Sequence, residues 1–358
     1  MKKTLAALAV AAFAAGTVST ANAVEVYNQD GAKLEIGGSF RAYAGKTADA
    51  TTATDKRSDL KNDGSRISIK ASQDLGNGLS AFVGYELRFS GSDNAEKKQV
   101  SASSNFGSPS TRQLFAGLKY ADIGALSFGR QATNVDDILL TDADYYKSGN
   151  YGPMTTRSDK SVKFRSAEWS GFSFGADYLF GNENKETAAR NYKHGYGAAL
   201  FYNTELPTAT KLKLAAGYNQ NAYDGLTDSR TDKKDSAWLL SAKVVQGPFD
   251  FALSYGKTKG RNGILAGTTA KEKGDYWAVA THYQVIEPSK VFLQWERESS
   301  KNEGYPTKEI KNHYIAGVDY KFHKNVVTYV QYQRETIKDS VGDRTNDNGV
   351  GVGLRVFF

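Results

Sequence analysis

Cysteine is absent from the 358-residue chain, proline occurs six times and histidine only four times. The lack of cysteine excludes a disulfide scaffold, a cysteine-based metal site and a thiol nucleophile. Long apolar runs are also missing, because the longest, residues 5–15, has eleven residues and lies near the start of the chain. A membrane-spanning helix needs roughly 20 apolar residues. Together with a mean hydropathy of −0.52, this excludes a bundle of membrane-spanning helices.

The first 23 residues have the layout of a secretory signal peptide. A basic start, Met1-Lys2-Lys3, precedes the apolar run, and Ala21-Asn22-Ala23 is a small-x-small cleavage site. We therefore expect residues 1–23 to be removed and residues 24–358 to form the mature domain. The formal net charge is +7, and the basic residues are scattered singly or in pairs. This scatter, together with export, argues against nucleic acid as a partner.

Glycine and aromatic residues are abundant, with 35 Gly, 21 Tyr and 18 Phe, and the hydrophobic pattern has a period of two. In residues 79–89 the odd positions are apolar, whereas the even positions are mostly polar, with Phe82 as the exception. Such alternation is typical of a strand with one apolar and one polar face. The pattern predicts sixteen strands, near 33–45, 64–75, 79–90, 111–120, 125–131, 161–169, 172–180, 193–202, 211–219, 236–245, 249–257, 275–284, 290–298, 312–321, 326–335 and 347–358.

The connections between these segments alternate in length, and all six prolines fall within them. Nearly every segment has one apolar face, often ending in Tyr, Phe or Trp, and an opposite face of charged residues, Ser and Gly. An apolar exterior with aromatic girdles, a polar interior and alternating loop lengths are typical of an outer-membrane barrel. The expected fold class is therefore all-β: a transmembrane antiparallel β-barrel of 16 strands, with long extracellular loops and short periplasmic turns. A soluble β-sandwich is the alternative.

Two of the predicted hairpins resemble a known family. One runs from Gly64 through Ser-Arg-Ile-Ser-Ile-Lys-Ala and the turn 76–78 to Phe89, and the other spans residues 115–130. Both are similar to the second-to-third and fourth-to-fifth strand hairpins of Gram-negative general diffusion porins, nearest the Pasteurellaceae-type major porins. The mature start, 24–31, and the terminal Phe358 also match.

The resemblance implies a 16-stranded barrel in outer-membrane lipid, usually a homotrimer, whose third long loop, 132–160, folds into the lumen. It implies passive diffusion of small hydrophilic solutes and ions through a water-filled channel, with no reaction and no cofactor.

The resemblance also implies a basic wall in the pore that faces acids of the third loop. Because they lie in the segments that match the family, Arg66, Arg130 and Arg165 are assigned to this wall by the resemblance. Strand alternation directs Arg66 and Arg165 inward, whereas Arg130 shares its phase with the apolar Phe128 and needs a bulge at Gly129 to turn inward. Four further basic residues are inward by the same alternation: Lys70, Lys163, Arg41 and Arg88.

The acidic side of the expected constriction lies in loop 132–160. Its candidate carboxylates are Asp136, Asp137, Asp142 and Asp144. Facing charges would create a transverse field that orients dipolar solutes and water. Family members often carry a Pro-Glu-Phe-Gly-Gly-like tip here, whereas this chain has 150–153, Asn-Tyr-Gly-Pro, so the carboxylate that reaches the constriction stays open. A solvated acidic loop is the alternative interpretation.

The family gives the terminal Phe358 a role as the signal read by the barrel-insertion machinery, with packing at a strand end as the alternative. Three other functions stay open. An outer-membrane hydrolase needs a positioned nucleophile and base, but no Gly-x-Ser-x-Gly or zinc motif accompanies the histidines, which are His194, His282, His313 and His323. A sugar-specific channel would use lumen aromatics, and those that are inward by alternation are Phe82, Phe201, Phe292 and Tyr329. An adhesin or structural barrel would use the long polar loops.

Overall fold

The computed structural model describes residues 23–50, 57–89, 106, 109–146, 152–183, 191–224, 233–260, 272–302 and 305–358. The expected signal peptide, 1–23, therefore lies outside the described residues except for Ala23, and so do residues 150 and 151 of the expected loop tip. No described helix is long and apolar enough to cross a membrane.

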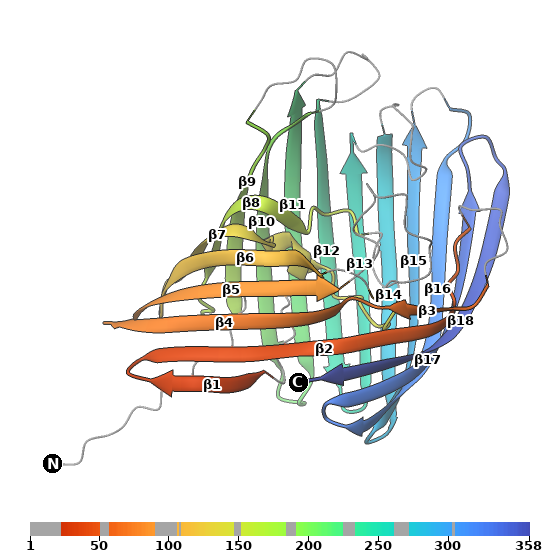
Figure 1. The fold of residues 1–358 in the computed structure, drawn as a ribbon. Helices are drawn as coiled ribbons and strands as arrows, with labels where there is room; N and C mark the ends of the chain where they lie inside the picture. Colours follow the sequence, from red (N-terminus) through yellow and green to blue (C-terminus); the bar gives the residue numbers. More distant parts are fainter. Residues whose placement is uncertain are drawn as a thin grey trace.

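Sixteen long strands, β2 and β4–β18, close into an antiparallel barrel (Figure 1). The ring closes where β18 pairs with β2, from Val350 opposite Lys46 to Phe357 opposite Ser39. Because neighbouring strands are antiparallel, the connections that follow β5, β7, β9, β11, β13, β15 and β17, which include the longer ones, all leave the barrel at the same end. This confirms the predicted number of strands and every predicted segment. The bounds are β2 (Ala32–Lys46), β4 (Ser65–Gly76), β5 (Leu79–Phe89), β6 (Pro109–Tyr120), β7 (Gly124–Ala132), β8 (Arg157–Ser166), β9 (Phe172–Phe180), β10 (Asn191–Glu205), β11 (Lys211–Asp224), β12 (Lys234–Gln246), β13 (Phe249–Lys259), β14 (Glu272–Ile286), β15 (Ser289–Asn302), β16 (Glu309–His323), β17 (Val326–Lys338) and β18 (Arg344–Phe357).

A short N-terminal strand that alternation did not predict, β1 (Val24–Gln29), joins the two ends of the chain. It forms a hairpin with β2 through the two-residue turn Asp30-Gly31. β1 pairs with residues 32–36 of β2 and β18 with residues 39–46, along the same edge. Between them, Gly38 and Phe358 exchange two backbone hydrogen bonds of 2.8 and 3.1 Å. The N- and C-terminal segments together therefore occupy one strand position of the closed sheet. We call each such strand position a column.

A second unpredicted strand, β3 (Asp59–Asn62), continues the column of β4 beside β2. The column is interrupted at Asp63-Gly64, where Gly64 has a φ of +70°. The backbone conformation requires glycine here, and a Cβ at this position would also displace the guanidinium of Arg88, whose Nε atom it would approach to 2.5 Å. The interruption allows Asp63 to pair with Arg355 on β18, which lies across β2.

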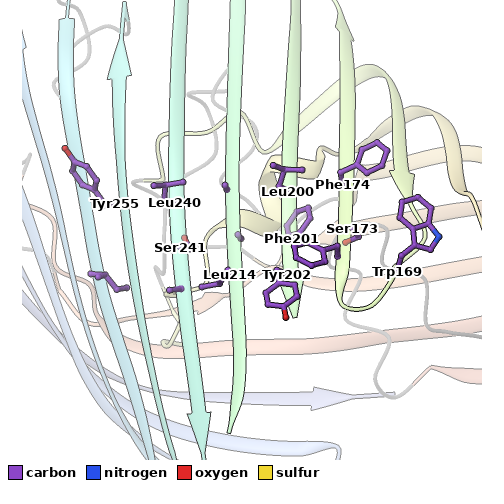
Figure 2. Close-up of a pocket in the computed structure, with 15 residues that line it drawn as sticks. Trp169, Ser173, Phe174, Leu200, Phe201, Tyr202, Leu214, Leu240, Ser241 and Tyr255 are labelled. Carbon is purple, nitrogen blue, oxygen red and sulfur yellow. The ribbon is translucent and has the colours of Figure 1, made fainter. Parts of the chain in front are cut away.

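The outside of the barrel is apolar. Large apolar side chains at alternate strand positions are about half exposed, for example Leu240 at 51% and Leu293 at 55%. On β9–β13 such side chains surround a depression of about 510 Å³, in which Leu200, Leu214 and Leu240 lie beside aromatic rings (Figure 2). An apolar surface that surrounds the whole barrel is suited to lipid rather than water. The outward orientation of the apolar faces is therefore confirmed.

The described parts of the connection between β7 and β8, residues 133–146 and 152–156, pack inside the barrel and begin with the 3-10 helix η1 (Asn134–Ile138). Val135, Ile138 and Met154 pack against the inward faces of β10–β14, where the buried partners include Phe201 and Leu239. The inner face of this half of the barrel is thus partly apolar, not uniformly polar as alternation suggested. The reason is that the loop covers these strands and shields them from the water of the lumen.

Candidate functional site

Four arginines from consecutive columns of the barrel form what we call the arginine wall: Arg41 on β2, Arg66 on β4, Arg88 on β5 and Arg112 on β6. The positive charges of Arg41, Arg88 and Arg112 repel the positive charge of Arg66. The carboxylate of Glu86, which is fully buried, lies between two of them, 2.6 Å from Arg112 Nη1 and 3.6 Å from Arg66 Nη1. One carboxylate therefore faces four guanidinium groups, and the wall has an excess of positive charge.

Arg112 is a member of the wall that sequence reasoning missed. It shares its phase with the exposed Leu114, so alternation places it outside. In the structure Glu86 of β5 pairs with Gln113, but the next residue of β5 pairs with Thr111, which leaves Arg112 as an extra residue in β6. Such a bulge changes the direction of a side chain. No local sequence pattern reveals it.

A second basic group lies on β8, next to the loop. Arg165 Nη1 is 3.3 Å from Asp137 Oδ2, and its guanidinium lies 3.7 Å from the centre of the Phe201 ring. Lys163 is almost completely buried, and its Nζ donates a 3.0 Å hydrogen bond to the carbonyl of Ala132. The structure therefore brings these two predicted basic residues together with a predicted loop carboxylate.

Arg130 does not join either basic group. The expected irregularity is present, since the register between β7 and β8 shifts between Gly129 and Gln131. However, Arg130 Nη1 pairs at 2.8 Å with Asp159, whose side chain is 72% exposed. Its Nε donates to the backbone carbonyl of Arg112 at 3.3 Å. The guanidinium thus lies at an exposed acid of β8, apart from Glu86 and the loop carboxylates.

Lys70 lies on β4 four residues beyond Arg66, toward the short turn. It is half-buried and pairs across the strands with Glu35 on β2. This lysine therefore extends the inward basic row toward the short-turn end of the barrel.

The start of the loop is fixed to the wall by Asn134. Its backbone N–H donates to Asp177 Oδ2 at 2.8 Å and its side-chain amide to Asp177 Oδ1 at 3.0 Å. The same amide donates to the carbonyl of Phe164 on β8 at 3.0 Å. Asn134 is completely buried. These bonds hold η1 against β8 and β9 and so fix the positions of the carboxylates that follow.

The far part of the loop is bound to the other side of the barrel. Ala143 N–H donates to Gln294 Oε1 on β15 at 2.8 Å. On β17, Gln331 Oε1 accepts hydrogen bonds from the N–H groups of Tyr145 and Tyr146 at 3.1 and 3.3 Å, and its amide donates to the carbonyl of Tyr146 at 2.6 Å. The loop therefore runs along the inner wall from β9 to β17.

Arg355 on β18 adds a further contact that was not predicted. Its Nη2 lies 2.7 Å from Asp63 Oδ2 and donates to the carbonyl of Tyr145, and its guanidinium lies 4.9 Å from the centre of the Tyr145 ring. The hydroxyl of Tyr145 donates to Asp319 on β16. Burial, together with this hydrogen bond, raises the pKa of Tyr145 well above its ordinary value. Tyr145 therefore acts as a neutral donor at neutral pH.

The four predicted loop carboxylates differ in their surroundings. Asp136 and Asp137 are partly buried next to basic side chains, Asp144 is half-buried and Asp142 is exposed. Burial raises the pKa of Asp136 to about 6; the charge of Asp137 adds to this shift and that of Arg157 on β8 opposes it. Burial likewise raises the pKa of Asp137. Asp136 and Asp137 are thus the two loop acids that lie beside the basic groups.

Further acids lie on the inner faces of β14–β17, which sequence reasoning did not single out. These strands carry the buried carboxylates of Glu272, Glu296, Glu309 and Glu335. In the closed ring β14 lies eight columns from β6, half-way around the barrel, whereas β17 lies two columns from β2. Glu335 pairs with Lys311 at 2.7 Å. Glu272 on β14 therefore lies across the lumen from Arg112, whereas Glu335 lies near the Arg41 side of the ring.

Phe358 lies at the column where the two chain ends meet. Its ring is 48% exposed on the outer face. A Cβ on Gly38 would lie 2.6 Å from the Cζ atom of this ring, so the close approach requires glycine at that position. Phe40, Ile67 and Phe106 surround the same outer hollow of about 260 Å³.

His282 on β14, one of the four histidines, contacts the loop. Its Nδ1 lies 2.9 Å from Asp250 and its Nε2 lies 3.0 Å from the carbonyl of Ala143. His313 is buried on the inner face of β16, and His323 lies at the exposed end of that strand. In the part of the chain that is described, no group of three or more His, Asp and Glu side chains is placed to hold a metal ion.

Comparisons with known proteins agree with this geometry. A family model described as Gram-negative porin matches residues 4–340. Two proteins described as major outer membrane protein, from Pasteurella multocida and from its strain Pm70, are 35% and 34% identical over the whole length of both chains.

Solved structures share the fold at low sequence identity. An anion-selective porin from Comamonas acidovorans has a TM-score of 0.70 at 18% identity, covering 91% of this chain and 100% of that one. OmpF of Salmonella typhi has a TM-score of 0.66 at 20% identity, covering 94% and 100%. OmpT of Vibrio cholerae, solved in a trimer form, has a TM-score of 0.66 at 18% identity, covering 92% and 100%.

Proposed function

The chain belongs to the Gram-negative porin family, and we propose that its channel is narrowest where residues 133–146 and 152–156 face the arginine wall. The protein is an outer-membrane porin that lets small hydrophilic solutes diffuse passively through the barrel. The observation that carries the proposed constriction is the attachment of the loop at two places, near its start to Asp177 on β9 and at Tyr145 and Tyr146 to Gln331 on β17. A loop bound in this way narrows the lumen while these hydrogen bonds are in place.

At this constriction the basic wall comprises Arg41, Arg66, Arg88 and Arg112, followed by Lys163 and Arg165 on β8, with Lys70 nearer the short turns. Its acidic side comprises Asp136 and Asp137, with Asp142 and Asp144 farther along the loop. Because the wall has more positive than negative charge within it, the pore prefers small anions. The preference is modest, since Asp142, which is exposed, and the half-buried Asp144 add negative charge to the same lumen.

The proposal is tested by replacing Arg112 with Gln and measuring the reversal potential of single channels in a planar bilayer under a KCl gradient. One charge acts on an ion 4 Å away with about 1 kcal/mol in water, or roughly a fivefold change in ion occupancy. We therefore expect R112Q to lower the anion-to-cation permeability ratio two- to fivefold, by order of magnitude.

Arg130→Gln is the matched control for this experiment, because it removes the same charge from the neighbouring strand at an exposed ion pair. We expect R130Q to keep the wild-type anion-to-cation permeability ratio. Equal effects of the two variants would refute the assignment of the constriction to the arginine wall.

A passive channel also fits the positions of the aromatic residues better than a sugar-specific pore does. A sugar path needs rings that face the water of the lumen. Phe82, Phe201, Phe292 and Tyr329 are at most 8% exposed. The loop covers two of them, since Tyr145 packs against Phe292 and Tyr329. Passive diffusion needs no reaction, cofactor or nucleic acid.

The remaining parts of the proposal concern assembly. Removal of residues 1–23 on export leaves the domain 24–358, and the insertion machinery reads Phe358. The barrel forms a homotrimer, as the trimeric OmpT structure supports. Small residues beside the closing column, Gly38, Ala42 and Ala71, would permit close contact between subunits. The long connections face the outside of the cell and the short turns face the periplasm.

A further inference from the structure

Met154 is the one methionine that remains once residues 1–23 are removed, because the chain contains two and the other is Met1. The chain also has no cysteine. The expected mature protein therefore contains a single sulfur atom. This atom lies in the loop that forms the proposed constriction, three residues before β8 begins at Arg157.

The side chain of Met154 packs residues 152–156, which we call the returning limb of the loop, against the inner wall. It belongs to the buried apolar cluster that includes Ile138, Phe201 and Leu239. On β11, Gly217 has no side chain, and a Cβ there would lie 3.3 Å from the methyl carbon of Met154. The inner wall therefore leaves room for this side chain.

Thr155 adds polar contacts to the same attachment. Its hydroxyl oxygen accepts hydrogen bonds from the side-chain amides of Asn221 at 2.9 Å and Asn219 at 3.2 Å, both on β11. Its carbonyl accepts a 2.8 Å hydrogen bond from the hydroxyl of Thr133, at the start of the loop. The returning limb is thus held by hydrogen bonds at Thr155 and by apolar contacts at Met154.

Met154 lies at the edge of the apolar cluster, where the water of the lumen begins. The other two loop residues of the cluster, Val135 and Ile138, are 2% and 0% exposed, whereas Met154 is 6% exposed. The chain is fully exposed two residues later, at Thr156. Hydrogen peroxide is a small hydrophilic solute of the kind that the proposed channel passes, so the lumen brings this oxidant to the edge of the cluster.

We propose that Met154 is an oxidation site at which peroxide loosens the attachment of the loop. The thioether sulfur attacks the O–O bond of hydrogen peroxide and takes one oxygen atom, and the other oxygen leaves with both protons as water. The sulfur is oxidised by two electrons and the peroxide is reduced by two. The product is a methionine sulfoxide, a polar and chiral side chain that disrupts apolar packing.

The sulfoxide oxygen is a strong acceptor placed among apolar side chains. Burying such a group without a hydrogen-bond donor is unfavourable, so the returning limb should leave β11 more often and the constriction should widen. This effect on the current rests on the proposed function, whereas the oxidation of Met154 itself does not.

The test treats the folded mature protein with hydrogen peroxide, locates the added oxygen by peptide mass spectrometry and records single channels in planar bilayers. We expect one added oxygen atom, on Met154. The oxidised channels should spend roughly tenfold more time in states of higher conductance, the ratio that corresponds to the loss of one buried apolar contact of this size.

Met154→Leu is the matched control, because leucine has a similar volume and no sulfur. Its current should not respond to peroxide. Met154→Gln places a polar side chain at the same position and should give the oxidised current without peroxide. The double variant M154L/L206M moves the thioether to a short turn, where Leu206 is 44% exposed. It should gain one oxygen and keep the wild-type current.

Two outcomes would overturn the proposal. One is a Met154 that stays unoxidised at a peroxide dose that oxidises the double variant. The other is oxidation of Met154 that leaves the conductance unchanged or lowers it. Neither outcome affects the proposed constriction, which the reversal potential of R112Q tests without peroxide.

Discussion

At the scale of single residues, Glu86 determines how closely the arginines of the wall can approach one another. It is completely buried and contacts both Arg66 and Arg112. Guanidinium groups on neighbouring strands repel one another, and a buried carboxylate between them offsets part of that repulsion. Alternation alone predicts that Glu86, Arg66 and Arg88 share the inner face. It cannot predict Arg112, because a one-residue bulge reverses the phase and the bulge is defined by pairing with another strand.

Asp136 makes the selectivity of the pore depend on pH. Burial raises its pKa to about 6, so acidification from pH 7 to pH 5 protonates it. Loss of this negative charge beside the basic groups should raise the anion-to-cation permeability ratio, with most of the change near pH 6. The raised pKa of this carboxyl group also lowers the stability of the folded barrel: the destabilisation is full above pH 6, shrinks as the pH falls from about 6 toward the ordinary value of 3.8, and is absent below it. Reversal potentials at pH 5, 6 and 7 measure the change in selectivity.

The controls for the pH effect come from the same loop. At pH 7, D136N should have the anion-to-cation permeability ratio that the wild type has at pH 5. Its ratio should then change little between pH 7 and pH 5. D142N changes the exposed acid farther along the loop, and its anion-to-cation permeability ratio should still rise near pH 6 as in the wild type. A wild-type reversal potential that is constant from pH 7 to pH 5 would contradict the prediction.

At the scale of elements, the loop is positioned mainly by residues of distant strands. Gln294 and Gln331 bind its backbone from positions more than 150 residues away in the sequence. Their alternation shows that they face inward, but no local pattern indicates which inward glutamine meets the loop. The apolar residues of η1 carry a clearer signal, because Val135 and Ile138 flank Asp136 and Asp137, and two further apolar residues, Leu139 and Leu140, follow directly. Such a segment needs an apolar surface, which the inner faces of β10–β12 provide.

Gln331→Ala tests whether the bonds to the loop keep the constriction closed. The change removes three hydrogen bonds to Tyr145 and Tyr146, each worth about 0.5–1.5 kcal/mol. A loss of 1.4 kcal/mol corresponds to roughly a tenfold change in an equilibrium, so the fraction of time with the loop detached should rise at least tenfold. Single-channel recordings should show more open-channel noise and excursions to higher conductance, with little change in the unfolding temperature of the barrel.

The control is Gln284→Ala, which removes an exposed glutamine whose amide binds a carbonyl of the next short turn. It should give the wild-type current trace. Quiet, wild-type-like channels from Q331A would show that other contacts suffice to hold the loop.

At the scale of the whole molecule, the closed ring brings together groups that no single element contains. Arg112 on β6 lies across the lumen from Glu272 on β14, because eight columns separate these strands in a ring of sixteen. Alternation predicted every long strand, since each must present an apolar face to lipid over its full length. It missed β1 and β3, which are short and lie mostly beside β2. Local sequence patterns therefore cannot predict how the ring closes, because closure joins residues near Val24 to residues near Phe358.

Closure also leads to a prediction for Phe358. Deleting this residue removes its two backbone hydrogen bonds to Gly38 and its outward ring, whereas the lumen contacts stay intact. Assembly in the outer membrane should fall severalfold, measured as heat-modifiable barrel on gels, and the channels that do assemble should have wild-type conductance.

Phe358→Ala keeps both backbone hydrogen bonds, so an equal loss of assembly would identify the ring itself as the signal. Phe322→Ala, which removes a ring that is 69% exposed near a short turn, is the control and should assemble normally. Normal assembly of the deletion would contradict a role for Phe358 in either closure or recognition.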